Sequence, residues 1–126
     1  MKANEIQIGD LVIPHLFDSK LEPSKIVGIH YNSYKGKDYV DWVDCDVWDE
    51  LSMNDIEPIH LTEEILEKNF AKEPQIAWCV GWNKKDDIHV EINRENLNAS
   101  FYGVIDFVHQ LQHALRLCGI EKTIEL

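Results

Sequence analysis

The sequence predicts an α+β protein, with an SH3-like all-β first half followed by an antiparallel sheet, a short helix and a long amphipathic C-terminal helix. Three observations carry this prediction. Runs rich in β-branched and aromatic residues, separated by turn residues, fill the first sixty positions. Residues 76–82 and 88–92 alternate in polarity around a polar turn, which is typical of a hairpin. From Val104 onward, apolar residues recur at helical spacing.

The first half, residues 1–61, is expected to contain five short strands, near residues 6–8, 11–13, 26–31, 38–44 and 56–61. Pro14 ends the second run because it cannot donate a ladder hydrogen bond. The segment 32–37 is expected to connect a hairpin, and the segment 52–55 to form one helical turn or a tight turn. Short strands joined by tight turns indicate a small SH3-like barrel or a strongly bent sheet.

Alternation along residues 39–51 assigns the side chains of the returning strand to two faces. The inward positions are expected to be Tyr39, Val43, Cys45, Val47 and Leu51. The outward positions are expected to include Trp42, Asp44, Asp46 and Trp48. Two tryptophans are therefore predicted on an acidic face.

The second half, residues 62–126, begins with a predicted helix. Thr62 is a suitable N-cap, and Glu63 and Glu64 suit the positive end of the helix dipole. Pro74 is expected to end the helical pattern. The only candidate domain boundary is the junction at residues 58–62, and we leave open whether the two halves share one core.

The rest of the second half is predicted as a hairpin, a third strand and a helix. The hairpin turns at residues 83–86 and places Trp78 and Trp82 in the core, and a short strand follows near residues 99–102. The helix is marked by Val104, Val108, Leu111, Leu115 and Cys118, with Gly119 as its C-terminal cap. Residues 120–126 are a candidate last strand.

The negative charge is concentrated in one segment. Twelve Lys and Arg against 23 Asp and Glu give a net charge of −11, with histidines neutral. Residues 37–64 hold ten of the acids and only one base, Lys37, which is a net −9. Polyanions such as nucleic acids and anionic membranes are held by clustered cations, so the sequence argues against both as direct partners.

Further features argue for a cytoplasmic protein. The sequence contains no run of about 18 apolar residues, and its first residues lack the apolar core of a signal peptide. Its three cysteines, Cys45, Cys79 and Cys118, show no paired spacing and sit in apolar patterns, so we expect them to be unpaired and buried.

The strongest functional indication is the combination of carboxylates and tryptophans in residues 41–49. Carboxylates beside exposed aromatic rings can bind Lys or Arg through charge and cation–π contact together. The candidate binding residues are Asp41, Trp42, Asp44, Asp46, Trp48 and Asp49. The alternative is a solvated acidic face, with the tryptophans in the core.

A second constellation lies on the C-terminal helix. His109 and His113, at i and i+4, could reach one metal ion, as zinc sites of the H-E-x-x-H type do. Gln110 stands where that motif has its general base, and spacing identifies no third ligand. We therefore expect His109, Gln110, Gln112 and His113 to form a polar helix face opposite the apolar stripe, exposed to solvent or to a partner.

No catalytic residue or cofactor is predicted. The acidic neighbours Asp44 and Asp46 should raise the pKa of the Cys45 thiol, which disfavours a nucleophile. The glycines form no phosphate-binding loop and the serines form no nucleophile elbow. With 23 acids in the chain, a carboxylate pair carries almost no specificity.

Three segments resemble a group of short bacterial proteins. They are the K-A-N-E-I-x-I-G-D opening at residues 2–10, the I-E-P-I-x-L-T-E-E centre at residues 56–64, and the V-H-Q-L-Q helix at residues 108–112. The chain is similar in these segments to proteins of no established activity from Bacteroidetes genomes, prophages and mobile elements. His60 replaces the proline usual in that group, and Phe107 replaces a tyrosine. The resemblance implies a bacterial or phage-derived cytoplasmic protein and carries over no activity.

The sequence therefore predicts a non-enzymatic binding module that engages a basic protein surface. Mimicry of DNA charge is a narrower form of this hypothesis, and a weaker one, because such mimics spread negative charge over more of their surface. The alternatives are a small metal-dependent hydrolase using His109 and His113, and an oligomeric structural protein. The identity of the partner and the oligomeric state stay open.

Overall fold

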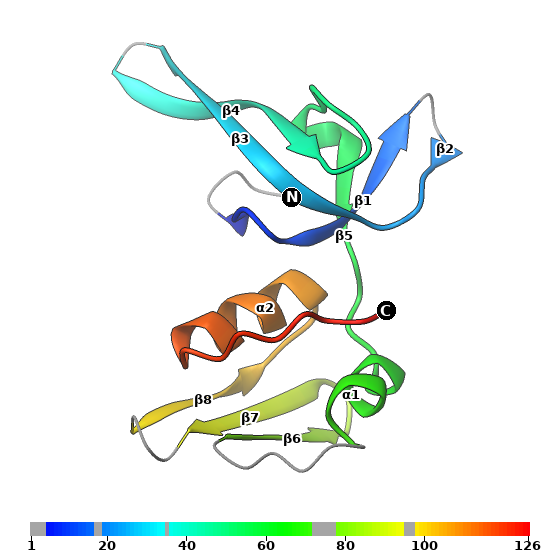
Figure 1. Cartoon of the computed structure of the whole chain (residues 1–126), viewed down its shortest axis with the longest axis vertical. Helices are drawn as coiled ribbons and strands as arrows, with labels where there is room; N and C mark the ends of the chain where they lie inside the picture. Colours follow the sequence, from blue (N-terminus) through cyan, green and yellow to red (C-terminus); the bar gives the residue numbers. More distant parts are fainter. Residues whose placement is uncertain (1–4, 17–18, 35, 72–77, 95–97) are drawn as a thin grey trace. The chain divides into compact units, whose positions relative to one another are not determined.

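The computed structural model describes residues 5–16, 19–34, 36–71, 78–94 and 98–126 (Figure 1). The chain divides into two compact units, Met1–Ile59 and His60–Leu126. The boundary predicted after residue 61 lies two residues further along the chain. Both units contain antiparallel sheets, and the second adds two α-helices, so the protein is α+β.

Unit 1 is built from short antiparallel strands and one 3₁₀ turn (Figure 1). The elements are β1 (Leu11–Leu16), β2 (Ser19–Lys20), β3 (Ser24–Tyr34), β4 (Lys37–Cys45), η2 (Met53–Asp55) and β5 (Ile56–Pro58). The strand order is β2-β1-β3-β4, and β5 pairs with β1. Among the described residues this pairing does not close into a barrel, so the predicted SH3-like barrel is not what the strand pairing shows.

The core of unit 1 comes from inward positions of these strands and from two residues outside them, Ile6 and Leu51. Its buried members are Ile6, Val12, Ile26, Val43, Cys45, Leu51 and Ile56. Of the helical turn or tight turn predicted at residues 52–55, the structure has the helical turn, η2, and the Ser52 hydroxyl caps it by accepting the Asn54 N–H at 3.1 Å. The strand predicted at residues 6–8 is wrong: this segment is a turn in which the Gln7 N–H donates to the Asp10 carboxylate at 2.8 Å.

Two irregularities of the β3–β4 pairing change which residues face outward. The register passes from His30 opposite Trp42 to Tyr31 opposite Val40, so Asp41 is an extra residue on β4. A bulge of this kind reverses the alternation beyond it. Val40 therefore packs against the core and Tyr39 is exposed, which corrects the inward position predicted for Tyr39. A second shift, between Ile26 and Gly28, occurs on β3.

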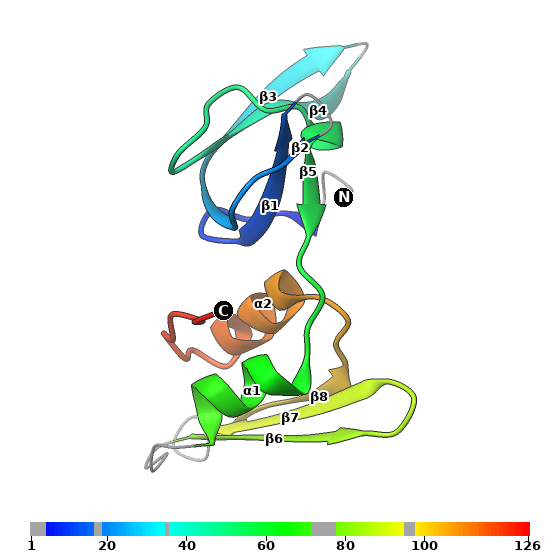
Figure 2. The same cartoon turned by 90° about the vertical axis from the view of Figure 1, so that its right-hand side faces the viewer.

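Unit 2 is a three-stranded sheet with both helices on one face (Figures 1 and 2). Its elements are α1 (Glu63–Phe70), β6 (Cys79–Lys84), β7 (Ile88–Arg94), β8 (Ala99–Val104) and α2 (Val108–Leu117). The strand order is β6-β7-β8, which confirms the predicted hairpin and third strand. Thr62 caps α1 as predicted, with its hydroxyl accepting the Ile65 N–H at 3.3 Å.

The long C-terminal helix predicted from Val104 is not observed. Val104 ends β8, and α2 covers ten residues from Val108. Val104 is 46% exposed whereas Val108 is fully buried, so the apolar spacing from Val104 to Val108 does not mark one buried face. Gly119 ends the helix with φ +69°, as a C-terminal glycine does.

The segment after α2 is held without being a strand. Ile120 and Ile124 are buried, and the Asn69 side chain binds both the N–H and the carbonyl of Glu125, at 2.7 and 2.8 Å. The strand predicted at residues 120–126 is therefore wrong, because a side-chain amide replaces a partner strand.

Some sequence predictions on unit 2 need correction or fall outside the described residues. Trp78 and Trp82, which were predicted in the core, are only partly buried. Cys79 was predicted to be buried and is exposed. Cys118, like Cys45 in unit 1, is buried as predicted, and all three thiols are free. Pro74 and Ile76 lie outside the described residues. Neither helix in the described part of the chain is long and apolar enough to cross a membrane.

Candidate functional site

The predicted acidic and aromatic residues lie on the outer side of β3–β4 and on the loop that follows β4. We call this set, namely Asp41, Trp42, Asp44, Asp46, Trp48 and Asp49, the acidic hairpin surface. In the register of the pair, Gly28 is opposite Asp44 and His30 is opposite Trp42. The antiparallel ladder thus places His30 beside Trp42 on this surface. The sequence prediction did not include His30.

His30 links the aromatic and the acidic parts of this surface. Its Nε2 atom lies 2.6 Å from Oδ2 of Asp44, and its ring stacks on Trp42 with centroids 4.5 Å apart and planes at 22°. Gly28 leaves room for the pair, because a Cβ there would lie 3.2 Å from the same Asp44 oxygen. One face of Trp42 is therefore occupied from within the protein.

Asp44 also fixes the loop after β4. Its Oδ1 atom accepts the Glu50 N–H at 2.8 Å. This backbone hydrogen bond, followed by the hydrogen bond with His30, lowers the pKa of Asp44 below its ordinary value of 3.8. Asp44 is therefore a charged anchor that joins strand and loop.

The loop itself is a tight connection that projects two apolar side chains. Val43 and Leu51 exchange backbone hydrogen bonds of 2.8 and 2.9 Å, and the Cys45 N–H donates to the Trp48 carbonyl at 2.7 Å. The side chains at the tip are exposed, at 68% for Val47 and 42% for Trp48. The predicted alternation therefore ends at Cys45: Val47 is not inward, and Trp48 belongs to the loop rather than to the strand face.

The four predicted aspartates differ in their roles. Asp44 holds the loop, and Asp46 accepts the Lys25 N–H at 3.2 Å. Asp41 and Asp49 are exposed, and within the described parts of the chain their carboxylates make no hydrogen bond or ion pair. Two of the acids are thus structural, and two are available to a partner.

The cysteine in this region is not a nucleophile. Burial, together with the nearby carboxylates of Asp46 and Asp44, raises the pKa of Cys45 to about 11. The sequence predicted from the acidic neighbours that the pKa of Cys45 is raised, but burial is the larger cause of the increase.

Of the four residues predicted on a polar face of the C-terminal helix, His109 is buried, whereas Gln110, Gln112 and His113 are partly exposed. His109 is only 1% exposed, its ring lies parallel to Phe107 with centroids 5.7 Å apart, and His113 approaches it edge-on at 5.6 Å. The exposed placement predicted for His109 is wrong: its side chain is buried and contacts two other rings. Phe107 in turn contacts His60, at 5.2 Å.

The glutamines of α2 have separate positions. The Oε1 atom of Gln110 accepts the N–H groups of Asp106 and Phe107 at 3.0 and 3.1 Å, so this side chain caps the helix. Gln112 lines a shallow depression beside the C-terminal segment. Among the residues with described positions, no group of three or more His, Cys, Asp or Glu could hold a metal ion, so His109 and His113 gain no third ligand.

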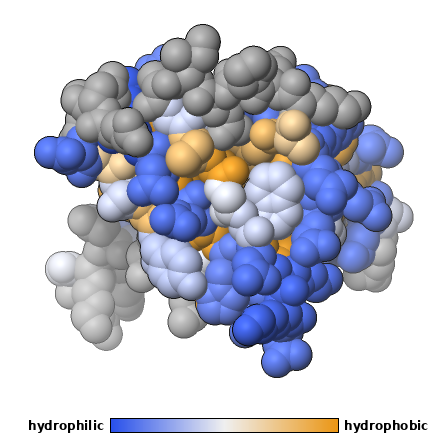
Figure 3. All heavy atoms as spheres, turned by 90° about the horizontal axis from the view of Figure 1, so that it is seen from below, coloured by the Kyte–Doolittle hydropathy of each residue, from blue (hydrophilic) through white to orange (hydrophobic). Residues whose placement is uncertain are grey.

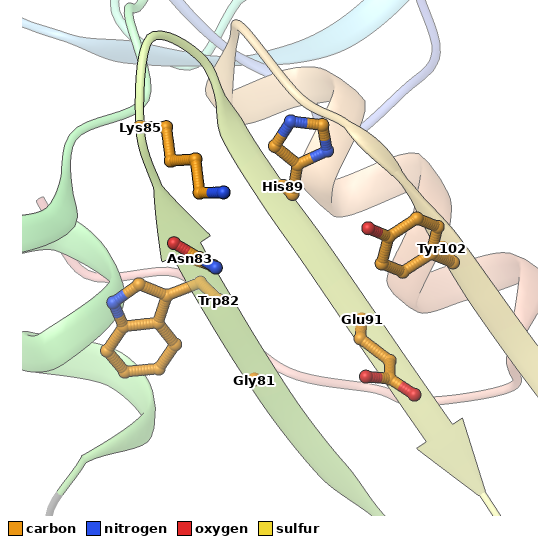
Figure 4. Close-up of a pocket in the computed structure, with 7 residues that line it drawn as sticks. All are labelled: Gly81, Trp82, Asn83, Lys85, His89, Glu91 and Tyr102. Carbon is orange, nitrogen blue, oxygen red and sulfur yellow. The ribbon is translucent and has the colours of Figure 1, made fainter.

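The structure also shows a hollow that the sequence prediction did not identify. It lies on the face of the β6-β7-β8 sheet away from the helices, has a volume of about 570 Å³, and is shown in Figure 4. Its lining residues are Gly81, Trp82, Asn83, Lys85, His89, Glu91 and Tyr102. The sequence did contain a signal for this face of the sheet. Alternation along the hairpin places Gly81, Asn83, His89 and Glu91 at outward positions on β6 and β7.

Comparison with known protein-family models, curated proteins and solved structures gave no match for this chain.

Proposed function

We propose that the chain is a non-enzymatic protein-binding module that engages a basic protein surface through the acidic hairpin surface. The observation that carries the proposal is a set of three exposed side chains on one hairpin and its loop: the carboxylate of Asp41 on β4, and the indole of Trp48 with the neighbouring carboxylate of Asp49 on the loop that follows. A lysine or arginine can meet a carboxylate and the indole at once, and a cation over an exposed indole contributes about 0.5–1 kcal/mol.

The arrangement of the anchors supports Trp48 as the aromatic contact. His30 already covers one face of Trp42, and Asp44 is held by His30 and by the loop backbone. These contacts make the surface rigid and reduce the ordering cost of binding. The partner should therefore place its cations near Asp41, Trp48 and Asp49.

The proposal includes the protein's origin and setting. We place the chain in the cytoplasm and in the bacterial, prophage or mobile-element group that its three segments resemble.

We also propose that unit 1 is a relative of SH3-like barrels. Its support is the 3₁₀ turn immediately before β5, the return of β5 to β1, and the Val43–Leu51 bridge.

The test uses a fluorescein-labelled peptide of alternating lysine and glycine, with binding followed by fluorescence anisotropy. Asp41→Asn combined with Asp49→Asn should weaken binding by roughly threefold to tenfold, since exposed ion pairs contribute about 0.2–1 kcal/mol each. Trp48→Ala should weaken it further. Asp44 and Asp46 are unsuitable for this test because their removal disturbs the loop.

The matched control is Asp86→Asn combined with Asp87→Asn, which changes the net charge equally at two exposed positions in unit 2. This control should bind the peptide as the unmodified protein does. Equal losses in the two double variants would mean that only net charge matters, and the proposed surface would be wrong.

A further inference from the structure

The hollow on the open face of the unit 2 sheet is produced by a glycine. Gly81, Glu91 and Tyr102 lie side by side on β6, β7 and β8 in the register of the sheet. A Cβ on Gly81 would meet nothing within 4 Å, so the floor of the hollow is bare backbone. Figure 4 shows His89, Glu91 and Tyr102 extending from β7 and β8, with Lys85 beside His89 near the hairpin turn.

Aromatic rings form part of the wall. The rings of His89 and Tyr102 are nearly parallel, with centroids 6.2 Å apart and planes at 28°. Tyr102 is 73% exposed, which is unusual for a large aromatic side chain on a sheet. Trp82 extends from β6, at the edge of the sheet (Figure 4). Seen from the side of this sheet, pale side chains of intermediate hydropathy lie among strongly hydrophilic ones (Figure 3).

The polar groups around the floor include donors and acceptors. The Asn83 amide and the Tyr102 hydroxyl can do both, Lys85 donates, and Glu91 accepts. In the described structure only Glu91 uses its side chain in a hydrogen bond, accepting from Asn93 Nδ2 at 3.1 Å. The single lysine and the single glutamate balance each other, so the hollow has no charge preference.

We propose that this hollow binds a neutral oligosaccharide. A sugar ring offers an apolar face of C–H groups to an aromatic ring, and hydroxyls at its rim that donate and accept hydrogen bonds. The open glycine floor admits a flat ring, and the mixed polar lining matches hydroxyls better than it matches an ion. A single-stranded nucleic acid could also stack on these rings, but the lining of the hollow, with one lysine and one glutamate, is not the basic groove that tracks a phosphate backbone.

The decisive variant is Gly81→Val. The added side chain enters empty space and suits a strand, so it fills the hollow without disturbing the fold. Cys79→Val is the matched control, because Cys79 is exposed on the same strand and the same face but does not line the hollow. Circular dichroism and thermal unfolding should show both variants folded.

Binding is measured by amide chemical shifts of the isotope-labelled full chain, titrated separately with cellohexaose, chitohexaose, mannohexaose and oligothymidylate. At least one of the three sugars should shift the amides of Gly81, Glu91 and Tyr102. Gly81→Val should weaken that binding by about tenfold or more, while Cys79→Val keeps it within about twofold.

Three results would overturn the proposal. They are an absence of shifts with all three sugars, binding of oligothymidylate in preference to the sugars, or binding that survives Gly81→Val. The site is separate from the acidic hairpin surface, so Asp41→Asn and Asp49→Asn should leave sugar binding unchanged. Failure of one proposal therefore leaves the other standing.

Discussion

At the scale of single residues, Asp44 shows how a surface charge can be structural. The sequence places it among many acids and offers no reason to separate it from Asp41 or Asp49. The structure gives it two partners, the His30 ring and the Glu50 N–H, that come from a different strand and from a loop. A mutation that removes this carboxylate would therefore change the shape of the surface as well as its charge.

The lowered pKa of Asp44 leads to a prediction about pH and stability. Because the folded state lowers this pKa, the ionised carboxylate stabilises the fold above its unfolded pKa near 3.8, and that contribution is lost as pH falls through the lower folded value. The unfolding temperature should therefore fall less between pH 7 and pH 3 in Asp44→Asn than in the unmodified protein. Thermal unfolding followed by circular dichroism measures the difference.

A control separates this effect from general acid sensitivity. Asp86→Asn alters an exposed carboxylate in unit 2 and should retain the full fall in unfolding temperature. Glu57, whose pKa is lowered chiefly by its hydrogen bond with Lys20, contributes in the same direction and stays in both variants. An identical fall in Asp44→Asn and the unmodified protein would contradict the prediction.

At the scale of elements, long-range side-chain contacts replace secondary structure at the C-terminus. Asn69 on α1 donates to the carbonyls of Ile65 and Glu125 and accepts the Glu125 N–H. The cationic side chain of Arg94 donates to the carbonyls of Cys118 and Gly119, where α2 ends. A cation at this end of a helix also favours the helix dipole.

The Asn69 contact predicts a measurable loss of stability. Asn69→Leu keeps the branched shape of the side chain but leaves the Glu125 peptide group without its partner, which should cost about 1–3 kcal/mol of the free energy of unfolding. Urea unfolding followed by circular dichroism measures this cost. Asn54→Leu, at an exposed position in η2, serves as the control and should cost far less. Equal costs in the two variants would show that the hydrogen bonds between Asn69 and Glu125 do not contribute to the free energy of unfolding.

The β3–β4 pair shows at the same scale why strand faces were only partly predictable. Val43 and Cys45 are inward as alternation predicts, because the register shift between them adds its extra residue to β3 and leaves β4 regular. Beyond Asp41 the extra residue reverses the faces, and after Cys45 the strand ends. Alternation is a local rule, whereas the position of a bulge depends on how two strands fit together.

At the scale of the whole molecule, the two compact units predict separate responses to core mutations. Ile26 is fully buried in unit 1 and Leu111 is fully buried in unit 2. Truncating either to alanine should cost about 2–5 kcal/mol. Hydrogen exchange with mass spectrometry should show Ile26→Ala losing protection mainly in residues 5–59, and Leu111→Ala mainly in residues 60–126. Equal loss throughout the chain by either variant would show that the two cores unfold together.

The net charge leads to a prediction about binding and pH. Histidine is the side chain type whose ordinary charge change falls between pH 8 and pH 5, and the chain combines six histidines with a net charge of −11. The protein is therefore expected to be less negative at pH 5.5 than at pH 7. The lysine–glycine peptide keeps its charge over this range, so its affinity for the protein should decrease. Anisotropy titrations at the two pH values, at constant ionic strength, test this, and an unchanged or increased affinity would contradict it.

The sequence by itself determined the features that depend on neighbours along the chain. The hairpin in unit 2, the turn at residues 52–55, the cap at Thr62, the glycine at the end of α2 and the acidic segment were all readable, because capping, turns and alternation act within a few residues. The tertiary structure alone decided what distant residues do to one another. It paired His30 with Asp44 across fourteen positions, covered His109 with other rings, and left Gly81 bare in the floor of a hollow. Those outcomes depend on strand register and on packing between elements, and local sequence patterns specify neither.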